Sequence, residues 1–180
     1  MASQKFREYV DGLTEDTDPD IDADWVHTND ASDSAPKKVK PRNLTKKIQL
    51  NADLGTDDTY EGITIVGKNA GETLTQWDAV YLKSDGKWWL ASAEFGATNK
   101  AWGLAVTAGT ANNPLTVLAY GIVRNDAWAW TVGGEIYLSV DGALSHTTMS
   151  ASGDIVQQVG YAISADIAFF DFNSTVTEVP

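Results

Sequence analysis

From residue 62 onward, short apolar runs alternate with turn residues along the chain. The runs are rich in Val, Ile, Tyr, Trp and Phe, and Gly, Asn and Asp separate them. No stretch after residue 60 has a helical period, and short strands with close turns are typical of a sandwich or barrel. The pattern therefore predicts a mainly β fold, a small antiparallel β-barrel or sandwich, with strands at Ile63–Gly67, Ala79–Lys83, Lys87–Ala93, Ala101–Val106, Leu115–Arg124, Glu135–Val140, Ala143–Thr147, Ile155–Ile163 and Ile167–Phe172.

Two Asp-Gly pairs stand between strand-like runs, at Ser84–Lys87 and Val140–Ala143. Asp-Gly supplies the positive φ angles of a type I′ turn, so we expect a tight hairpin at each. The two hairpins, Val80–Gly86 and Ile136–Gly142, resemble each other, and a similar third strand follows each of them. This repeat favours a duplicated three-strand unit that closes into a barrel. The alternative is that Asp-Gly hairpins look alike by convergence.

The first 36 residues have a different texture, with few aliphatic and many Asp, Ser and Thr side chains. Such a segment cannot bury enough apolar surface to offset its chain entropy, so it is either disordered or ordered by a partner. A short helix is predicted over Phe6–Leu13, because Phe6, Tyr9, Val10 and Leu13 share one helical face. Beyond it, Trp25–His27 and Lys38–Lys40 are predicted to form two short strands joined by a polar loop.

Charge divides the chain into three parts. Residues 1–36 carry ten acids and two bases, residues 37–47 six bases and no acid, and residues 48–180 fifteen acids and five bases. The net charge of −12 repels phosphate backbones and anionic bilayers, so we expect no nucleic-acid and no membrane partner. We predict an N-terminal anchoring arm (residues 1–47), a connecting segment (48–69) and a β-barrel domain (70–180).

Several kinds of site and segment are missing residues that they require. The chain has no cysteine, which excludes a disulfide framework, a thiolate metal site and a cysteine nucleophile. No apolar run reaches the roughly 18 residues of a membrane span, and the first residues lack the apolar stretch of a signal peptide. The acidic loop 15–24 alternates Asp as a calcium loop does. Counted from Asp16, however, Ile21 stands where an EF-hand needs Gly and His27 where it needs Glu.

Catalytic constellations are equally incomplete. His27 and His146 are the only histidines, and Ser145 beside His146 would point to the opposite face of a strand. Asp126, near Trp128 and Trp130, is the one neighbourhood suggestive of sugar chemistry. We therefore expect no catalytic residue, no cofactor and no metal, and hence no enzyme. Trp128 and Trp130 are kept as possible glycan or subunit contacts, because a chain with seven Trp can use some at interfaces.

Two segments carry a resemblance to known proteins. Leu13–Asp20 through Trp25-Val26, followed by Ala35–Leu44, resembles the N-terminal anchoring segment of phage tail-fibre and related particle proteins. Residues 70–172, with Gly71-Glu72-Thr73-Leu74 and Gly133–Ser139, are similar to the small β-barrel of phage capsid-decoration and head-fibre proteins. Trp25-Val26-His27 stands where an apolar strand is usual, which leaves the register of that strand open.

The resemblance implies a trimeric structural protein of the virion, whose partner is the major capsid protein or a tail protein. We expect it to dock on the capsid surface as a decoration or head-fibre protein, through its arm. The alternatives are a tail-fibre adaptor or short tail component, and a glycan-binding module that contacts the host surface. The arm residues expected to bind the partner are Phe6, Tyr9, Leu13, Trp25, Val26, Lys37, Lys38, Val39 and Arg42.

Overall fold

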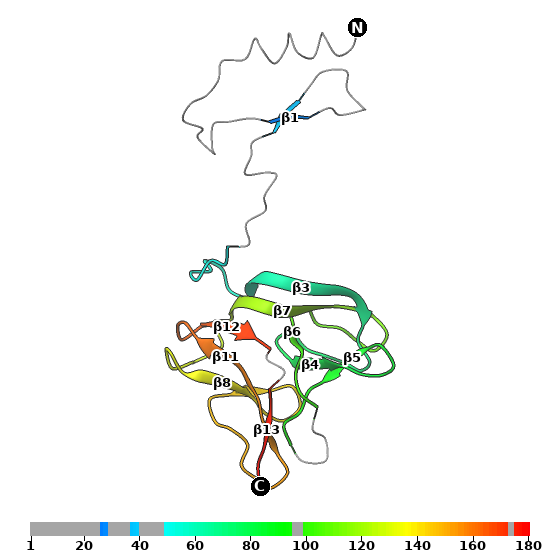
Figure 1. Ribbon diagram of the computed structural model, residues 1–180, viewed down its shortest axis with the longest axis vertical. Helices are drawn as coiled ribbons and strands as arrows, with labels where there is room; N and C mark the ends of the chain where they lie inside the picture. Colours follow the sequence, from blue (N-terminus) through cyan, green and yellow to red (C-terminus); the bar gives the residue numbers. More distant parts are fainter. Residues whose placement is uncertain (1–25, 29–36, 40–48, 95–98, 173–174) are drawn as a thin grey trace. The chain divides into compact units, whose positions relative to one another are not determined.

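The computed structural model describes residues 26–28, 37–39, 49–94, 99–172 and 175–180 (Figure 1). The chain divides into two compact units, Met1–Ile48 and Gln49–Pro180. In the first unit, β1 (Val26–Thr28) and β2 (Lys37–Val39) pair antiparallel, with Val26 opposite Val39. The predicted pair of short strands is therefore present. The predicted helix over Phe6–Leu13 lies outside the described residues.

The second unit is built of strands, and its described part contains no helix. Its main antiparallel sheet curls into a half-barrel, which confirms the predicted mainly β fold. The strands are β3 (Thr59–Asn69), β4 (Ala79–Leu82), β5 (Trp88–Leu90), β6 (Gly103–Ala105), β7 (Pro114–Arg124), β8 (Glu135–Leu138), β9 (Leu144–Ser145), β10 (Ile155–Val156), β11 (Gln158–Ala162), β12 (Ile167–Asp171) and β13 (Thr177–Glu178).

Strand β7 lies at the centre of this sheet, whose order is β5-β4-β6-β7-β12-β11-β8-β9. Strand β3 pairs along β7, from Thr59 opposite Arg124 to Asn69 opposite Pro114. A strand has only two edges, so β6 and β12 share the other edge of β7, one behind the other. In Figure 1, β6, β4 and β5 accordingly lie on one side, and β12, β11 and β8 on the other. Residues 59–69, expected within a connecting segment, thus belong to the sheet.

The two halves of the sheet repeat one pairing scheme. Strand β4 pairs with its hairpin partner β5 and with β6, and β8 pairs with its hairpin partner β9 and with β11. The predicted pair of similar three-strand units is therefore present. The two ends of the sheet are also linked by backbone hydrogen bonds. Ala93 N–H donates to Ser139 C=O at 2.9 Å, and Gly142 N–H donates to Ala91 C=O at 2.6 Å.

The two Asp-Gly turns differ. Asp141 (φ 46°) and Gly142 (φ 77°) are both left-handed, and Ala143 N–H donates to Val140 C=O, as the predicted type I′ turn requires. In the first hairpin only Gly86 (φ 76°) is left-handed, so the type I′ prediction for this turn is wrong. Asp85 stays at negative φ, and its carboxylate accepts hydrogen bonds from Lys87 N–H at 3.0 Å and from the Trp89 indole.

Three apolar clusters stabilise the second unit. The largest fills the inside of the curled sheet and includes Leu118, Ile136 and Phe170. A second surrounds Trp88 at the β4–β5 end. The third lies on the outer face, where Leu54 covers Ile122 and Ile167. Each cluster removes several large side chains from water, the dominant stabilising contribution for a fold without cysteine.

Candidate functional site

The residues expected to bind a partner through the arm are only partly described. Phe6, Tyr9, Leu13, Trp25 and Arg42 lie outside the described residues. Val26 belongs to β1, and Lys37, Lys38 and Val39 form β2, where their backbones pair with β1. The structure therefore places these four residues on one short hairpin. It leaves their partner-binding role a prediction.

Trp128 and Trp130 are half-buried and pack against the main core. The Trp128 ring contacts Trp130 (5.5 Å between centroids), Phe170 (6.0 Å) and Trp77 (6.2 Å). Nε1 of Trp130 is buried, and no described group accepts its hydrogen bond. These rings close the inside of the curled sheet, so their main contacts are with the core rather than with solvent.

His146 is held by the backbone on both sides of its ring. Its Nε2 accepts a hydrogen bond from Thr131 N–H at 2.9 Å, and its Nδ1 lies 2.6 Å from Glu135 C=O. Since a carbonyl only accepts, Nδ1 carries the proton in this arrangement. Trp130 packs edge-on against the same ring, with centroids 4.9 Å apart. His146 thus ties the loop before β8 to the loop after β9, with both ring nitrogens engaged by the backbone.

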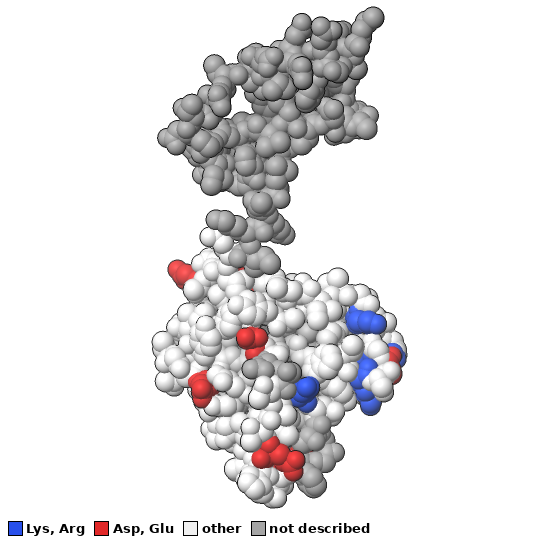
Figure 2. Space-filling model, in the orientation of Figure 1, with Lys and Arg blue, Asp and Glu red and all other residues white. Residues whose placement is uncertain are grey.

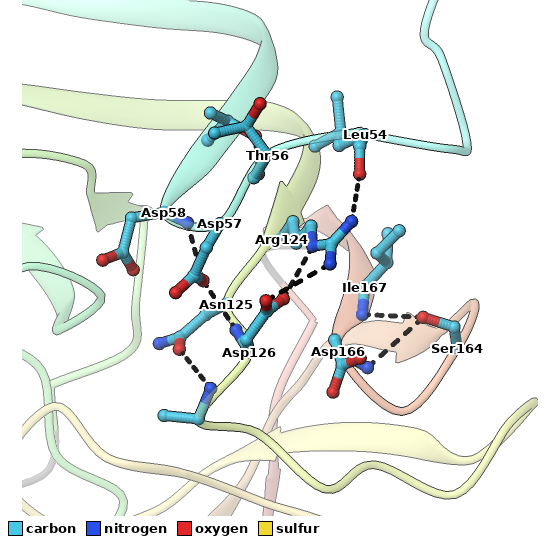
Figure 3. A network of polar contacts seen from close by, with 12 residues as sticks. Leu54, Thr56, Asp57, Asp58, Arg124, Asn125, Asp126, Ser164, Asp166 and Ile167 are labelled. Carbon is cyan, nitrogen blue, oxygen red and sulfur yellow. Dashed lines mark hydrogen bonds and ion pairs between the residues drawn. The ribbon is translucent and has the colours of Figure 1, made fainter.

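Arg124, at the end of β7, organises the polar network in Figure 3. Its guanidinium donates to Asp126 through Nε (2.6 Å) and Nη2 (3.2 Å), and to Leu54 C=O at 2.7 Å. Asp57 accepts from Asp126 N–H at 2.7 Å. The hydrogen bond from Arg124 lowers the pKa of the Asp126 carboxyl below its ordinary 3.8. Asp126 is therefore a fixed ion-pair partner, unlike the general acid of a glycosidase, whose pKa is raised.

The outer face of the sheet carries a row of side chains that sequence reasoning did not single out. Cross-strand pairs place Ile122, Phe169, Tyr161 and Glu135 side by side across β7, β12, β11 and β8. The Tyr161 and Phe169 rings lie 5.1 Å apart, tilted by 33°. Tyr120 meets Phe169 edge-on, with centroids 4.9 Å apart. Tyr161 is 46% exposed and Tyr120 38% exposed, so this part of the face is open to solvent.

An open groove of about 480 Å³ lies over this aromatic row. Tyr161 and Phe169 line it together with Tyr137, Gln158 and Asp171. The Tyr137 hydroxyl donates a hydrogen bond to Glu135, which raises the pKa of Tyr137 above its ordinary 10.0. The groove thus combines apolar ring surface with amide, carboxylate and hydroxyl groups, the composition of a site for a small polar ligand.

Only part of this row had a signal in the sequence. Tyr161 alternates with the small residues Gly160 and Ala162, as an outward-facing strand position does, whereas Phe169 stands within the apolar run Ile167–Phe170 and is not distinguished from its neighbours. Pairing of β11 with β12 then brings the two rings together. The pairing partner could not be read from either strand alone.

Other chemistry is sparse on the described surface. Lys68, Lys83 and Lys87 belong to the end of the unit that holds β4 and β5. Figure 2 shows basic side chains over this end with an acidic one among them, and further acids over the rest of the face in view. Lys83 Nζ lies over the Trp89 ring, 4.1 Å from its centroid, and Lys87 Nζ donates to Asn112. Among the described residues, no group of three His, Asp or Glu side chains could hold a metal ion.

None of the described segments forms an apolar helix long enough to cross a bilayer. Comparison of the chain with models of known protein families gives no match, and comparison with curated proteins gives none either. The outer aromatic groove is therefore the candidate site on geometry alone.

Proposed function

We propose that this chain is a non-enzymatic structural protein of a phage particle. Its first unit docks on the capsid surface, and its second unit is displayed as a decoration or head-fibre domain. The observation that supports separate docking and displayed parts is the division of the chain at Ile48/Gln49. Among the described residues, the main sheet, the three apolar clusters and the links between the sheet ends all come from residues 49–180, so we expect this unit to fold without the arm.

The state of the candidate catalytic groups supports a non-enzymatic role. Both ring nitrogens of His146 are engaged by the backbone, and the Asp126 carboxylate is engaged by Arg124. A general acid or base needs a titratable group within reach of a substrate proton. The phage setting, the capsid partner and the trimeric state rest on the resemblance of the arm and of residues 70–172 to particle proteins. A tail-fibre adaptor would use the same arm, with a tail protein as its partner.

The proposal is tested with phage particles that lack this protein. Purified full-length chain and a fragment of residues 49–180 are each mixed with such particles, and the bound fraction is measured by co-sedimentation. We expect the full chain to bind and the fragment to stay in solution, with both showing the same thermal unfolding of the barrel. Equal binding of the fragment would overturn docking through the arm. Labelled protein imaged on particles then separates head from tail.

A charge-matched comparison sharpens the assignment. Lys37→Glu with Lys38→Glu changes the β2 strand of the arm, whereas Lys83→Glu with Lys87→Glu makes the same change of charge on the barrel. We expect only the first pair to lower binding to particles. Light scattering of the full chain in solution tests the trimer, and a mass of one chain at all concentrations would argue against it.

A further inference from the structure

We propose that the outer face of the half-barrel, around Tyr161 and Phe169, binds a neutral glycan. The inference goes beyond docking on a particle, because the groove belongs to the barrel and not to the arm. A sugar ring offers one face of C–H groups and a rim of hydroxyls. It is therefore recognised by an exposed aromatic ring with hydrogen-bonding side chains around it.

The aromatic floor meets the first requirement. Tyr161 is 46% exposed in a regular strand, and its ring lies 5.1 Å from Phe169 at a tilt of 33°. Phe169 is fixed from the other side by the edge-on Tyr120 ring. The rings are therefore held in place before any ligand arrives, which lowers the entropy cost of binding. Exposing such rings costs free energy in the isolated protein, and this cost is recovered when a ligand covers them.

The rim meets the second requirement. Gln158 carries an amide that both donates and accepts, Asp171 a carboxylate that accepts, and Thr175 and Thr177 hydroxyls that do both. Asp171 is the cross-strand partner of Tyr120, so an acceptor stands beside the aromatic row. At about 480 Å³, the groove is in the size range of small-ligand sites and suits one or two sugar units.

Charge selects the class of ligand. None of the described residues that line the groove is Lys or Arg, whereas Asp171 lies in it and Glu135 flanks Tyr161. An anionic sugar, a phosphate or a nucleic acid would meet uncompensated negative charge there. A second copy of this chain placed face to face would bring the same carboxylates together. A neutral glycan satisfies the acceptors through its hydroxyls and brings no charge.

The experiment uses the full-length chain on an array of neutral oligosaccharides (glucans, galactans, mannans and N-acetylhexosamine oligomers), with sialylated and sulfated glycans as the anionic arm. The strongest neutral glycan is then titrated by calorimetry. We expect neutral glycans to bind and anionic ones to stay at background. Binding of no neutral glycan, or preferential binding of anionic ones, would overturn the proposal.

Variants place the binding in the groove. Tyr161→Ala is expected to weaken the affinity at least tenfold, and Asp171→Asn several-fold. Tyr60→Ala is the matched control, because Tyr60 is a tyrosine of similar exposure (39%) outside the groove. Its cross-strand partner Val123 belongs to the inner core, so Tyr60 lies on the face of the sheet opposite the groove. Unchanged affinity in both groove variants, or an equal loss in Tyr60→Ala, would contradict the site. Particle co-sedimentation of Tyr161→Ala should equal that of the unchanged chain, so failure of the glycan site is distinguished from failure of docking.

Discussion

The side chain of Gln157 is hydrogen-bonded to both backbone polar groups of Ala101. Its Oε1 accepts from Ala101 N–H at 2.7 Å, and its Nε2 donates to Ala101 C=O at 2.9 Å. Gln157 is fully buried and Ala101 is 2% exposed, so water cannot replace either bond. The side-chain amide pairs with the Ala101 backbone as the backbone of a neighbouring strand would, and it joins segments 56 residues apart. Gln157 lies between β10, which pairs with β13, and β11, which belongs to the main sheet.

Replacing Gln157 by Leu should therefore destabilise the barrel strongly. The Ala101 N–H and C=O would be left buried without partners, at a cost of about 1–3 kcal/mol for each group. The free energy of unfolding, measured in urea, is expected to fall by about 2–5 kcal/mol. Gln158→Leu changes the exposed neighbour and should shift it by less than about 0.5 kcal/mol. A small effect of Gln157→Leu would show that Ala101 finds other partners.

Gly62 should not tolerate a side chain. It faces Gly121 across the β3–β7 pair, and a Cβ on Gly62 would lie 2.1 Å from the Tyr120 carbonyl oxygen. Gly62→Ala must push the two strands apart and is expected to cost about 1–3 kcal/mol. Gly55→Ala is the matched control, because a Cβ on Gly55 would meet no other atom within 4 Å. Thermal unfolding should separate the two variants, and equal stability would contradict the close strand approach.

The Arg124–Asp126 pair should make unfolding depend on pH in the acid range. The pKa of Asp126 is lowered in the folded protein, so its contribution is complete above its ordinary 3.8 and is lost as the pH falls below that value. Urea midpoints from pH 6 to pH 2.5 should therefore fall less for Asp126→Asn than for the unchanged chain. Asp53→Asn is the control variant, because it makes the same change of charge outside this pair. If Asp126→Asn kept the full acid-range slope, the ion pair would not be the source.

Trp128 should behave as a core residue. Its ring contacts Trp77, Trp130 and Phe170, so Trp128→Ala is expected to lower the free energy of unfolding by about 2–4 kcal/mol. Trp102 is 50% exposed, and Trp102→Ala should cost less than about 1 kcal/mol. Chemical denaturation measures both. A Trp128→Ala protein as stable as the unchanged chain would restore Trp128 as a candidate for surface contact.

The fold was largely predictable because its signals are local. Alternating apolar runs located the strands from β3 to β9 and β12, and the repeat of two hairpins predicted the common pairing scheme of β4 and β8. Ile155–Ile163 was expected as one strand and is divided into β10 and β11. The two strands pair with different partners, β10 with β13 and β11 with β8 and β12, and no local pattern contains these pairings.

The candidate site was not predictable in the same way. Trp128 and Trp130 drew attention by residue type, yet burial depends on which strands fold over them. The open row of Tyr120, Phe169 and Tyr161 comes from three strands, and it exists only through their register. Residue type alone could not show which aromatic rings would remain in contact with water.

The position of β7 also has a consequence for synthesis on the ribosome. Strand β7 is made after β3 and β6, but it ends at Arg124, long before β12 begins at Ile167. Strands β3 and β7 can therefore pair as they emerge. The C-terminal stretch of the other edge of β7 stays unpaired until β12 has been synthesised. Until β12 arrives, that stretch is an unpaired sheet edge, which other nascent chains could occupy. Rapid translation of residues 125–171 would shorten this exposure.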